Sequence, residues 1–391
     1  MLHTIHITDF RSCIDVRLSN LSEVVALVGR NGAGKTNIMQ AIDWFGSVAS
    51  GSPISAGSEE NGNISIEFSV DGDRYSYSIK KYNKYKILDG KVTENVDFHE
   101  ILSSIDGDGR ESVMLKRVGE VVWLAGSEDS LTISLSKSAI NWLTSFLPRS
   151  DSRRAPLLRV WHYFTRVTYY PLSEVLSSED VTFVVADELS KWADGVDSWK
   201  CISAVDTIRN IIKMNLGRES GSFDELKFLL GPDQLDVVDD IDVDVVPLRV
   251  NARDAGKEDN VAYVVAFKPS GHTGTFSFDR LSFGTKRVIQ MITSVLSDHA
   301  HVSMLEQPED GIHPALLYKI VPMIRSYVSN RQFIFSSHSP AVLNAVAPEE
   351  VRLIEMANGR TYARSLTDVE IGAAHNYLAR EGPLSDFIGS L

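Results

Sequence analysis

The segment VVALVGRNGAGKTNIMQAIDWF, Val24 to Phe45, decides the fold of this chain. It begins with an uninterrupted apolar run, Val24 to Val28, of the kind found in parallel strands that are buried on both faces. A glycine-rich loop, Gly29 to Thr36, follows directly. After the loop, apolar residues recur at helical spacing, at Ile38, Ala41, Ile42 and Phe45. The order of strand, glycine loop and helix predicts an α/β fold with a mainly parallel sheet.

Two further segments lie in the last third of the chain. Leu281 to Gly284 read LSFG, and VSMLEQPEDGIHP, which begins at Val302, is a strand pattern that ends in Glu306, Gln307 and Pro308. With the glycine loop, these segments resemble the Walker A, signature and Walker B motifs of ABC-type ATPases, in the order that the family requires. The tail of the last segment is more similar to RecF, SMC and OLD-type proteins than to transporter ATPases.

The resemblance implies an α/β fold, namely an ABC-type P-loop ATPase head with a mainly parallel sheet, an antiparallel β-subdomain and a compact, mostly helical insertion. We expect residues 1–135 to form the N-terminal part of the head, with Walker A and the β-subdomain. Residues 136–240 would form the insertion, and residues 241–391 the C-terminal part with signature, Walker B and switch histidine. Alternating apolar residues independently predict three antiparallel strands of the β-subdomain, at Ile64 to Phe68, Tyr75 to Ile79 and Tyr85 to Ile87.

The glycine loop is the predicted site for ATP and Mg²⁺. Its glycines let backbone N–H groups turn toward phosphates, Lys35 places a positive charge on the β and γ oxygens, and Thr36 offers a hydroxyl to Mg²⁺. Arg11 belongs to the tripeptide Phe10-Arg11-Ser12, which is similar to a turn of RecF-like and SMC-like heads whose arginine lies near the nucleotide. An ordinary solvated arginine is the alternative. The candidate ATP-binding residues here are Arg11, Asn31, Gly32, Gly34, Lys35 and Thr36.

The catalytic position departs from the family's pattern. Relatives usually carry two carboxylates before the proline, of which the first holds Mg²⁺ through water and the second polarises the attacking water. Glu306 can hold the metal together with Thr36, but Gln307 stands at the second position, and an amide cannot accept a proton although it can orient water. We expect tight ATP binding and slow hydrolysis. A natural low-turnover enzyme and a sequence substituted to trap the ATP-bound state explain Gln307 equally well.

The resemblance also implies a second copy of the chain. A Walker A loop holds phosphates from one side only, and in this family the partner's signature covers the other side. Ser282 and the N–H of Gly284 would contact the γ-phosphate bound by the other subunit, and the helix that starts near Thr285 adds its positive end. His338, in FIFSSHSP, matches the switch histidine that senses the γ-phosphate. We therefore expect a homodimer with composite ATP sites, and assembly beyond the dimer stays open.

Composition limits the other partners. A net charge of −13 argues against a protein that coats nucleic acid along its whole surface. Local DNA contact stays open, because two stretches are basic, but solvated strand edges use such residues too. These stretches are Lys80, Lys81, Lys84, Lys86 and Lys91, mixed with Tyr75, Tyr77, Tyr82 and Tyr85, and then Arg149, Arg153, Arg154, Arg159 and Arg166. The two cysteines and the lack of an export signal or long apolar run predict a cytoplasmic protein without a membrane partner.

The expected function is ATP-driven dimer closure that controls DNA or a separately encoded effector protein, in phage defence or DNA maintenance. Too few residues follow His338 for the nuclease domain of OLD-type relatives, which is why we expect a separate effector. A transporter nucleotide-binding subunit is the rival, although no glutamine occupies the Q-loop position that such subunits carry. A non-hydrolysing ATP-dependent scaffold is the third alternative. The aspartates between Asp236 and Asp244 alternate with valine and indicate an exposed strand face rather than a metal site.

Overall fold

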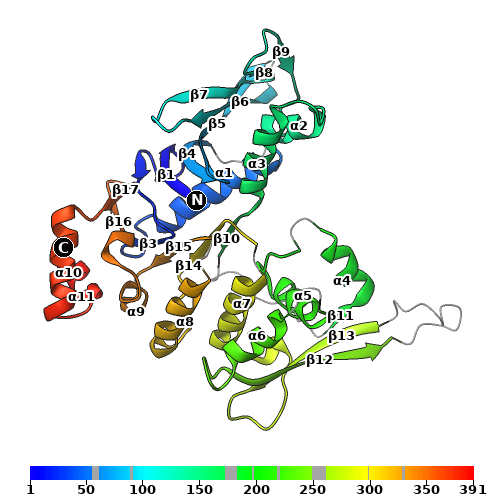
Figure 1. Ribbon diagram of the computed structural model, residues 1–391, viewed down its shortest axis with the longest axis vertical. Coiled ribbons are helices and arrows are strands. Elements are labelled where there is room, and N and C mark those ends of the chain that lie inside the picture. Colours follow the sequence, from blue (N-terminus) through cyan, green and yellow to red (C-terminus); the bar gives the residue numbers. More distant parts are fainter. Residues whose placement is uncertain are drawn as a thin grey trace, which may run out of the picture. The chain divides into compact units, whose positions relative to one another are not determined.

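The computed structural model describes residues 1–54, 61–88, 91–171, 183–195, 198–217, 221–248, 261–297, 299–327 and 331–391, with the backbone alone at 84–88 and 91–95. These residues form two compact units (Figure 1). Unit 1 consists of Met1–Tyr169, Ala300–Met304 and Asn330–Leu391. Unit 2 consists of Tyr170–His299 and Leu305–Ser329.

Unit 1 contains the predicted antiparallel β-subdomain as an eight-stranded sheet in the order β2-β1-β4-β5-β6-β7-β8-β9. Its strands are β1 (Leu2–Asp9), β2 (Val16–Leu18), β4 (Gly62–Val70), β5 (Asp73–Leu88), β6 (Lys91–Ile105), β7 (Glu111–Val118), β8 (Val121–Leu124) and β9 (Ser130–Thr132). The prediction of separate strands at Tyr75 to Ile79 and Tyr85 to Ile87 is wrong, because both lie in β5. No glycine or proline interrupts Lys80 to Lys84, so nothing in the sequence turns the chain there.

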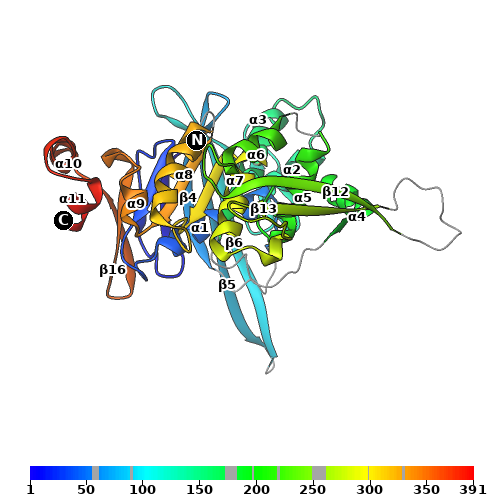
Figure 2. The same cartoon turned by 90° about the horizontal axis from the view of Figure 1, so that it is seen from below.

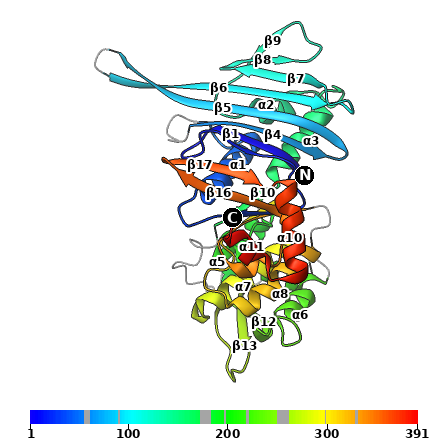
Figure 3. The same cartoon turned by 90° about the vertical axis from the view of Figure 1, so that its left-hand side faces the viewer.

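The hairpin of β5 and β6 is longer than its neighbours. β4 pairs with β5 only as far as Lys81, and β7 pairs with β6 only from His99 onward. Residues Tyr82–Leu88 therefore pair only with Lys91–Asp97 in the ladder of this sheet. Figure 3 shows the end of the hairpin extending past the adjacent strands as a two-stranded arm.

The mainly parallel sheet is confirmed. It has six strands in the order β10-β14-β15-β3-β16-β17, with bounds β10 (Val167–Tyr170), β14 (Val302–Glu306), β15 (Gln332–Ser337), β3 (Val24–Val28), β16 (Val351–Ala357) and β17 (Arg360–Ser365). β3 pairs in parallel with β15 on one side and β16 on the other, while β17 is antiparallel to β16. Every residue of β3, β14 and β15 is buried, as the continuous apolar pattern predicts. The last two residues of β14, Leu305 and Glu306, are assigned to unit 2.

The core of unit 1 joins both sheets to α1 (Lys35–Ser50), α2 (Ala139–Phe146) and α3 (Arg154–Thr165). Phe45 of α1 is fully buried, and its ring centroid lies 5.1 Å from that of Tyr77 and 5.2 Å from that of Phe164. Full burial of such a side chain stabilises the fold by roughly 1.5–3 kcal/mol. α2 and α3 lie inside the segment predicted as the insertion, 136–240, yet they pack with α1. The predicted domain boundaries stay a prediction.

Unit 2 contains a small sheet in the order β11-β13-β12. Its elements are β11 (Val184–Val185), α4 (Ala186–Ala193), α5 (Ala204–Asn215), α6 (Ser222–Leu230), β12 (Val238–Pro247), β13 (Val261–Pro269), the 3₁₀ turn η1 (Phe278–Arg280), α7 (Phe283–Ser297) and α8 (Pro314–Ser326). α5 and α6 pack against α7, and Figure 2 shows β12 and β13 side by side as a ribbon.

In the sequence, Trp199, Ile202, Val205, Ile208 and Ile212 recur at helical spacing and predict an amphipathic helix that stops near Gly217. The structure forms this helix as α5, with a later start. Trp199 precedes the helix, because Ser203 caps it and forms a capping box with Asp206. The helix ends before Gly217, as predicted, and Gly217 has a positive φ of 73°. On β12, Asp240 pairs with Lys227 at 2.5 Å, so at least this aspartate serves a structural ion pair.

The chain returns to unit 1 after α8. The pair Ser339-Pro340 predicts a helix cap, because a hydroxyl precedes a proline at the first helical position. The structure confirms it, since Ser339 caps α9 (Pro340–Leu343) by accepting a hydrogen bond from the N–H of Ala341 at 3.2 Å. The turn η2 (Pro348–Glu350), α10 (Asp368–Arg380) and α11 (Leu384–Gly389) complete the unit. Within the described ranges, no helix combines the length and the apolar character that crossing a membrane requires.

Candidate functional site

The predicted phosphate loop connects β3 to α1 in unit 1. Gly32 and Gly34 have φ values of 77° and 101°, a region that glycine adopts readily and other residues do not. A β-carbon on Gly29 would lie 2.1 Å from the carbonyl oxygen of Ile354. These positions need glycine, and they let the backbone lead directly into the first turn of α1, whose N–H groups favour an anion. The loop therefore has the form that a phosphate group requires.

Lys35 lies inside this loop. Its ammonium donates hydrogen bonds to the carbonyl oxygens of Gly29 at 2.7 Å and Arg30 at 3.0 Å, and only 5% of the residue is exposed. The positive charge is therefore held within the turn of the loop rather than in solvent. Thr36 follows in the first turn of α1 and is half-buried.

A hollow of about 770 Å³ lies beside the phosphate loop in unit 1. It is lined by Asn31 and Gly32 of the loop, by His338 after β15, and by residues of β16 and the C-terminal segment. The structure therefore brings the predicted switch histidine to the same hollow as the loop, although more than three hundred residues separate them in the sequence.

Arg11 lies in the turn between β1 and β2 and has a φ of 52°, which is unusual for a residue other than glycine. Its guanidinium donates to Oε1 of Gln40 on α1. The next residue, Ser12, has its hydroxyl 2.7 Å from Nδ2 of Asn37 and 2.7 Å from Oγ1 of Thr361. The predicted turn is thus attached to the start of α1. The sequence analysis missed Asn37 and Thr361. Asn37 directly follows Thr36, whereas no sequence signal marks Thr361.

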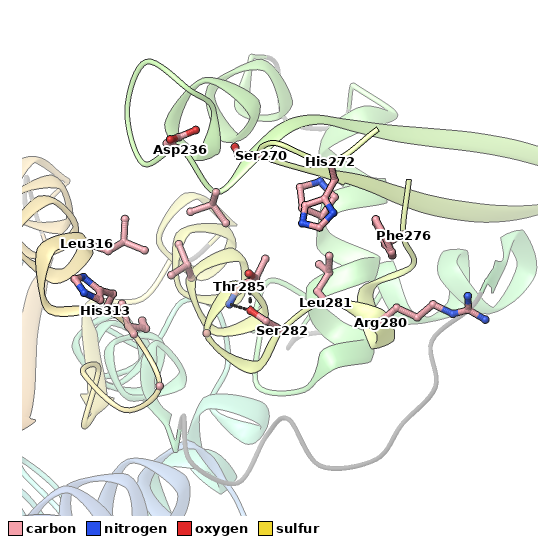
Figure 4. Close-up of a pocket in the computed structure, with 16 residues that line it drawn as sticks. Asp236, Ser270, His272, Phe276, Arg280, Leu281, Ser282, Thr285, His313 and Leu316 are labelled. Carbon is pink, nitrogen blue, oxygen red and sulfur yellow. Dashed lines mark hydrogen bonds between the residues drawn. The ribbon is translucent and has the colours of Figure 1, made fainter. Parts of the chain in front are cut away.

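The predicted signature lies in unit 2 at the start of α7. Ser282 is exposed, and its Oγ lies 2.8 Å from Oγ1 of Thr285 and accepts the N–H of Thr285 at 3.2 Å (Figure 4). Ser282 therefore caps α7, and the positive end of the helix dipole lies at this residue. A hollow of about 520 Å³ opens beside it, lined also by His272, Arg280 and His313.

The Walker B segment begins with β14, and its residues from Leu305 belong to unit 2. Glu306 ends β14 and is buried. Gln307 has a φ of 41°, and its carbonyl oxygen accepts a hydrogen bond of 2.6 Å from Nη2 of Arg287. Burial lowers the pKa of the Arg287 guanidinium, and the nearby Asp310 carboxylate opposes that change. Arg287 was missed by the sequence analysis, although a basic residue within the apolar pattern of a helix could have drawn attention to it.

The predicted site residues therefore form two groups. Unit 1 holds Arg11, Asn31, Gly32, Gly34, Lys35, Thr36 and His338, and unit 2 holds Ser282, Gly284, Glu306 and Gln307. In the described part of the chain, no cluster of three or more His, Cys, Asp or Glu residues could hold a metal by itself. Mg²⁺ in nucleotide sites commonly uses one or two carboxylates together with phosphate oxygens. Thr36 in unit 1 and Glu306 in unit 2 each carry an oxygen donor of the kind that this ion prefers.

The basic stretches are partly structural. Lys81 and Tyr77 are buried, so neither can contact DNA in this structure. Arg159 donates to Asp73 at 2.6 Å, and Arg153 forms an ion pair of 2.7 Å with Asp151. The side chains of Lys84, Tyr85, Lys86 and Lys91 lie outside the described residues. DNA contact stays a prediction.

Comparison with known proteins gives one family and a set of similar folds. A family with the description "AAA domain, putative AbiEii toxin, Type IV TA system" matches residues 24–154 and 201–344. No curated protein matches the chain at a significant level.

Three solved structures are similar to this chain in fold. The SmcHead bound to the C-winged helix domain of ScpA is 15% identical, with 95% of this chain and 99% of that chain covered and a TM-score of 0.45. The Smc head from Pyrococcus furiosus bound to the C-terminal domain of ScpA is 12% identical, with 97% and 99% covered and a TM-score of 0.47. The SMC head from Thermotoga maritima is 12% identical, with 94% and 99% covered and a TM-score of 0.38.

The family match covers both the phosphate loop and the signature, Walker B and switch segments. Because this match covers more than half of the chain, the chain belongs to the family described as "AAA domain, putative AbiEii toxin, Type IV TA system".

Proposed function

We propose that this chain binds Mg-ATP at the Walker A loop and that two copies close around two ATP molecules. The observation that carries the proposal is the division of the predicted contacts between two hollows. Residues that line the hollow of the Walker A loop come from unit 1, and residues that line the hollow of the signature come from unit 2. In the proposed assembly, each hollow would offer one half of the contacts that a triphosphate needs. A second copy would supply the other half.

Within one copy, the loop N–H groups and Lys35 would bind the phosphates, and Thr36 with Glu306 would hold Mg²⁺. The ion would neutralise charge on the β and γ oxygens. Exposed Ser282, at the positive end of α7, would contact the γ-phosphate of the partner's ATP, with the N–H of Gly284 beside it. His338, which lines the same hollow as the Walker A loop, would sense the γ-phosphate of the ATP bound by its own copy.

Gln307 would orient water without accepting its proton, so closure would be long-lived and hydrolysis slow. Closure would then control a separately encoded effector protein or DNA. The family's description names a toxin of a type IV toxin–antitoxin system, which supports a role in defence. We infer a homodimer as the working unit, and larger assemblies would be built from it.

A non-hydrolysing ATP-dependent scaffold is the second candidate, and Gln307 is the observation that favours it. Both candidates require ATP binding and closure. They differ only in whether turnover is part of the cycle.

Isothermal titration with Mg-ATP tests the proposal. Lys35→Met should remove ATP binding, because it removes the charge held inside the loop. Ser282→Arg should leave the affinity of a single copy for ATP within about threefold, because Ser282 acts on the partner's nucleotide. Equal loss of ATP binding in both variants, with both folded by circular dichroism, would refute the division of the site between copies.

A further inference from the structure

A buried arginine lies in the helix that begins at the signature. Arg287 is in α7, five positions after Ser282, and none of its side chain is exposed. Burying a guanidinium is unfavourable unless its donors find acceptors. Nη2 donates to the carbonyl oxygen of Gln307 at 2.6 Å, but Nε and Nη1 have no hydrogen-bond acceptor among the described atoms. A carboxylate oxygen of Asp310 lies 3.9 Å from Nη1.

The acceptor of this hydrogen bond is in a strained part of the chain. Gln307 has a φ of 41°, in the left-handed region that residues with a β-carbon enter at a cost. Such a conformation persists only when surrounding contacts determine it. The Arg287 guanidinium donates a hydrogen bond to the carbonyl oxygen of Gln307. The carboxylates of Glu306, Glu309 and Asp310 are close enough to act electrostatically on the guanidinium.

A second contact joins the same two segments. A β-carbon on Gly284 would lie 2.3 Å from the carbonyl oxygen of Gly311, and one on Gly311 would lie 2.3 Å from the ring of Phe283. The first turn of α7 is therefore packed backbone to backbone against the end of the Walker B turn. Arg287 contacts the start of the Walker B turn, at Gln307, and the first turn of α7 contacts the end of the Walker B turn, at Gly311.

We infer that Arg287 is a positioning residue that couples the signature of one copy to Gln307 of the same copy. The inference rests on the proposed function, in which Ser282 contacts the partner's ATP while Gln307 acts on the ATP of its own copy. The orientation of α7 is set at its first turn by Ser282, and Arg287 transmits that orientation to the backbone of Gln307. Each copy would then reach its catalytic geometry only when its signature rests on the partner's nucleotide.

Loss of this link should affect turnover more than binding. A misplacement of about 1 Å at a reacting group can lower a rate on the order of 100-fold, whereas phosphate binding depends on the Walker A loop. Arg287 is in a different unit from that loop. The expected signature is a lower kcat with little change in ATP affinity.

The test uses the full-length chain with Gln307→Glu, which supplies a general base and measurable turnover. Arg287→Met keeps the volume of the side chain and removes its donors. The matched control is Arg352→Met, because Arg352 is also buried and donates to main-chain carbonyls, those of Glu349, Val351, Ser19 and Asn20. We expect Arg287→Met to lower kcat at least about tenfold, with KM and ATP-dependent association within about threefold. The control should lower the melting temperature and keep kcat within about threefold.

An unchanged kcat in Arg287→Met overturns the inference, and so does a parallel fall of kcat and ATP affinity that matches a general loss of structure. If Arg287→Met does not fold, Arg287→Lys keeps the charge but presents one compact ammonium, and the same fall in kcat is expected. If the Gln307→Glu parent neither binds ATP nor associates, the proposed function fails as well. If the Gln307→Glu parent binds ATP, forms dimers and hydrolyses ATP, a lower kcat in Arg287→Met is due to Arg287.

Discussion

Gly34 lies directly against Thr361, and a β-carbon on Gly34 would stand 2.0 Å from the Thr361 hydroxyl oxygen. Thr361 also contacts the loop that carries Arg11, because its N–H donates a hydrogen bond to the carbonyl oxygen of Ser12 at 2.8 Å. Three segments from distant parts of the sequence therefore meet at the first residue before α1. The position of the Walker A loop depends on this close approach.

Gly34→Ala should therefore remove ATP binding and lower the free energy of unfolding by about 3 kcal/mol, since the methyl group meets a buried side chain and the φ of 101° is strained. Gly32→Ala is the matched control, because Gly32 also has a positive φ but no atom lies within 4 Å of its β-carbon position. In this control, the free energy of unfolding should fall by only about 1–2 kcal/mol, because backbone strain is the sole effect. Urea denaturation and ATP titration measure both effects. Equal losses in the two variants would contradict the close packing of Gly34.

A buried ion pair should stabilise the β-subdomain of unit 1. Arg117 and Glu100 have no exposed side-chain surface and lie 3.2 Å apart, and Glu100 also accepts hydrogen bonds from Tyr77 and from the N–H of Ala139. Arg117→Met leaves a carboxylate buried without its counter-charge, so the free energy of unfolding should fall by about 3–5 kcal/mol. The control is Arg74→Met, which removes a partly exposed pair with Glu67 in the same sheet and should cost less than about 1 kcal/mol. Equal losses in urea denaturation would contradict this prediction.

The stability of the protein should fall as the pH is lowered from about 8 to about 4. Burial lowers the pKa of the Met1 amino group to about 6. Burial, followed by the positive charges of Arg166 and the Met1 amino group, lowers the pKa of His301 to about 4, and Asp71 opposes this change. The unfolded chain therefore takes up protons at a higher pH than the folded chain, so protonation favours unfolding in this range. Both groups line one hollow of unit 1.

His301→Phe isolates one of these groups, because phenylalanine keeps the ring stacked on Tyr163 but does not titrate. The melting temperature of this variant should depend less on pH between about 6.5 and 4 than that of the unchanged protein, while the dependence between about 8 and 6 stays. An identical pH profile for the two proteins would show that His301 does not contribute.

Gln307→Glu should raise ATP turnover by about tenfold or more, the low end of what a positioned general base supplies. ATP affinity should stay within about threefold, because the phosphate contacts are elsewhere. Phosphate release at saturating ATP measures the rate, and Glu309→Gln serves as the control for a change of charge in the same turn. No gain in turnover would favour the scaffold over the ATPase.

The sequence predicts those parts of the fold that local patterns determine. The apolar run of β3, the helical spacing of α1 and the cap at Ser339 are local signals, and the structure confirms each of them. The prediction failed where a pattern was interrupted without a turn, as at Lys80 to Lys84 inside β5. It also failed where a capping side chain made a helix begin later than its apolar spacing, as Ser203 does at the start of α5.

The candidate site is predicted less completely. The motifs identify the glycine loop, Ser282 and Gln307 because their chemistry needs particular residues at fixed spacing. Thr361 and Arg287 belong to no such motif, and although Arg287 interrupts the apolar pattern of a helix, the sequence does not show which residues bury it. A charged or hydroxyl side chain is normally exposed, so only the folded chain shows that these two are inside.

If one copy supplies only half of each ATP site, two chains must associate when ATP binds, and the mass of the protein in solution shows whether they do. Light scattering with saturating Mg-ATP should show the mass of two chains, and without nucleotide the mass of one. Ser282→Arg should stay at one chain under both conditions, whereas Ser326→Arg, the same change at an exposed serine outside the signature hollow, should still associate. A mass of one chain for the unchanged protein at saturating Mg-ATP, or association of Ser282→Arg equal to that of Ser326→Arg, would contradict the account.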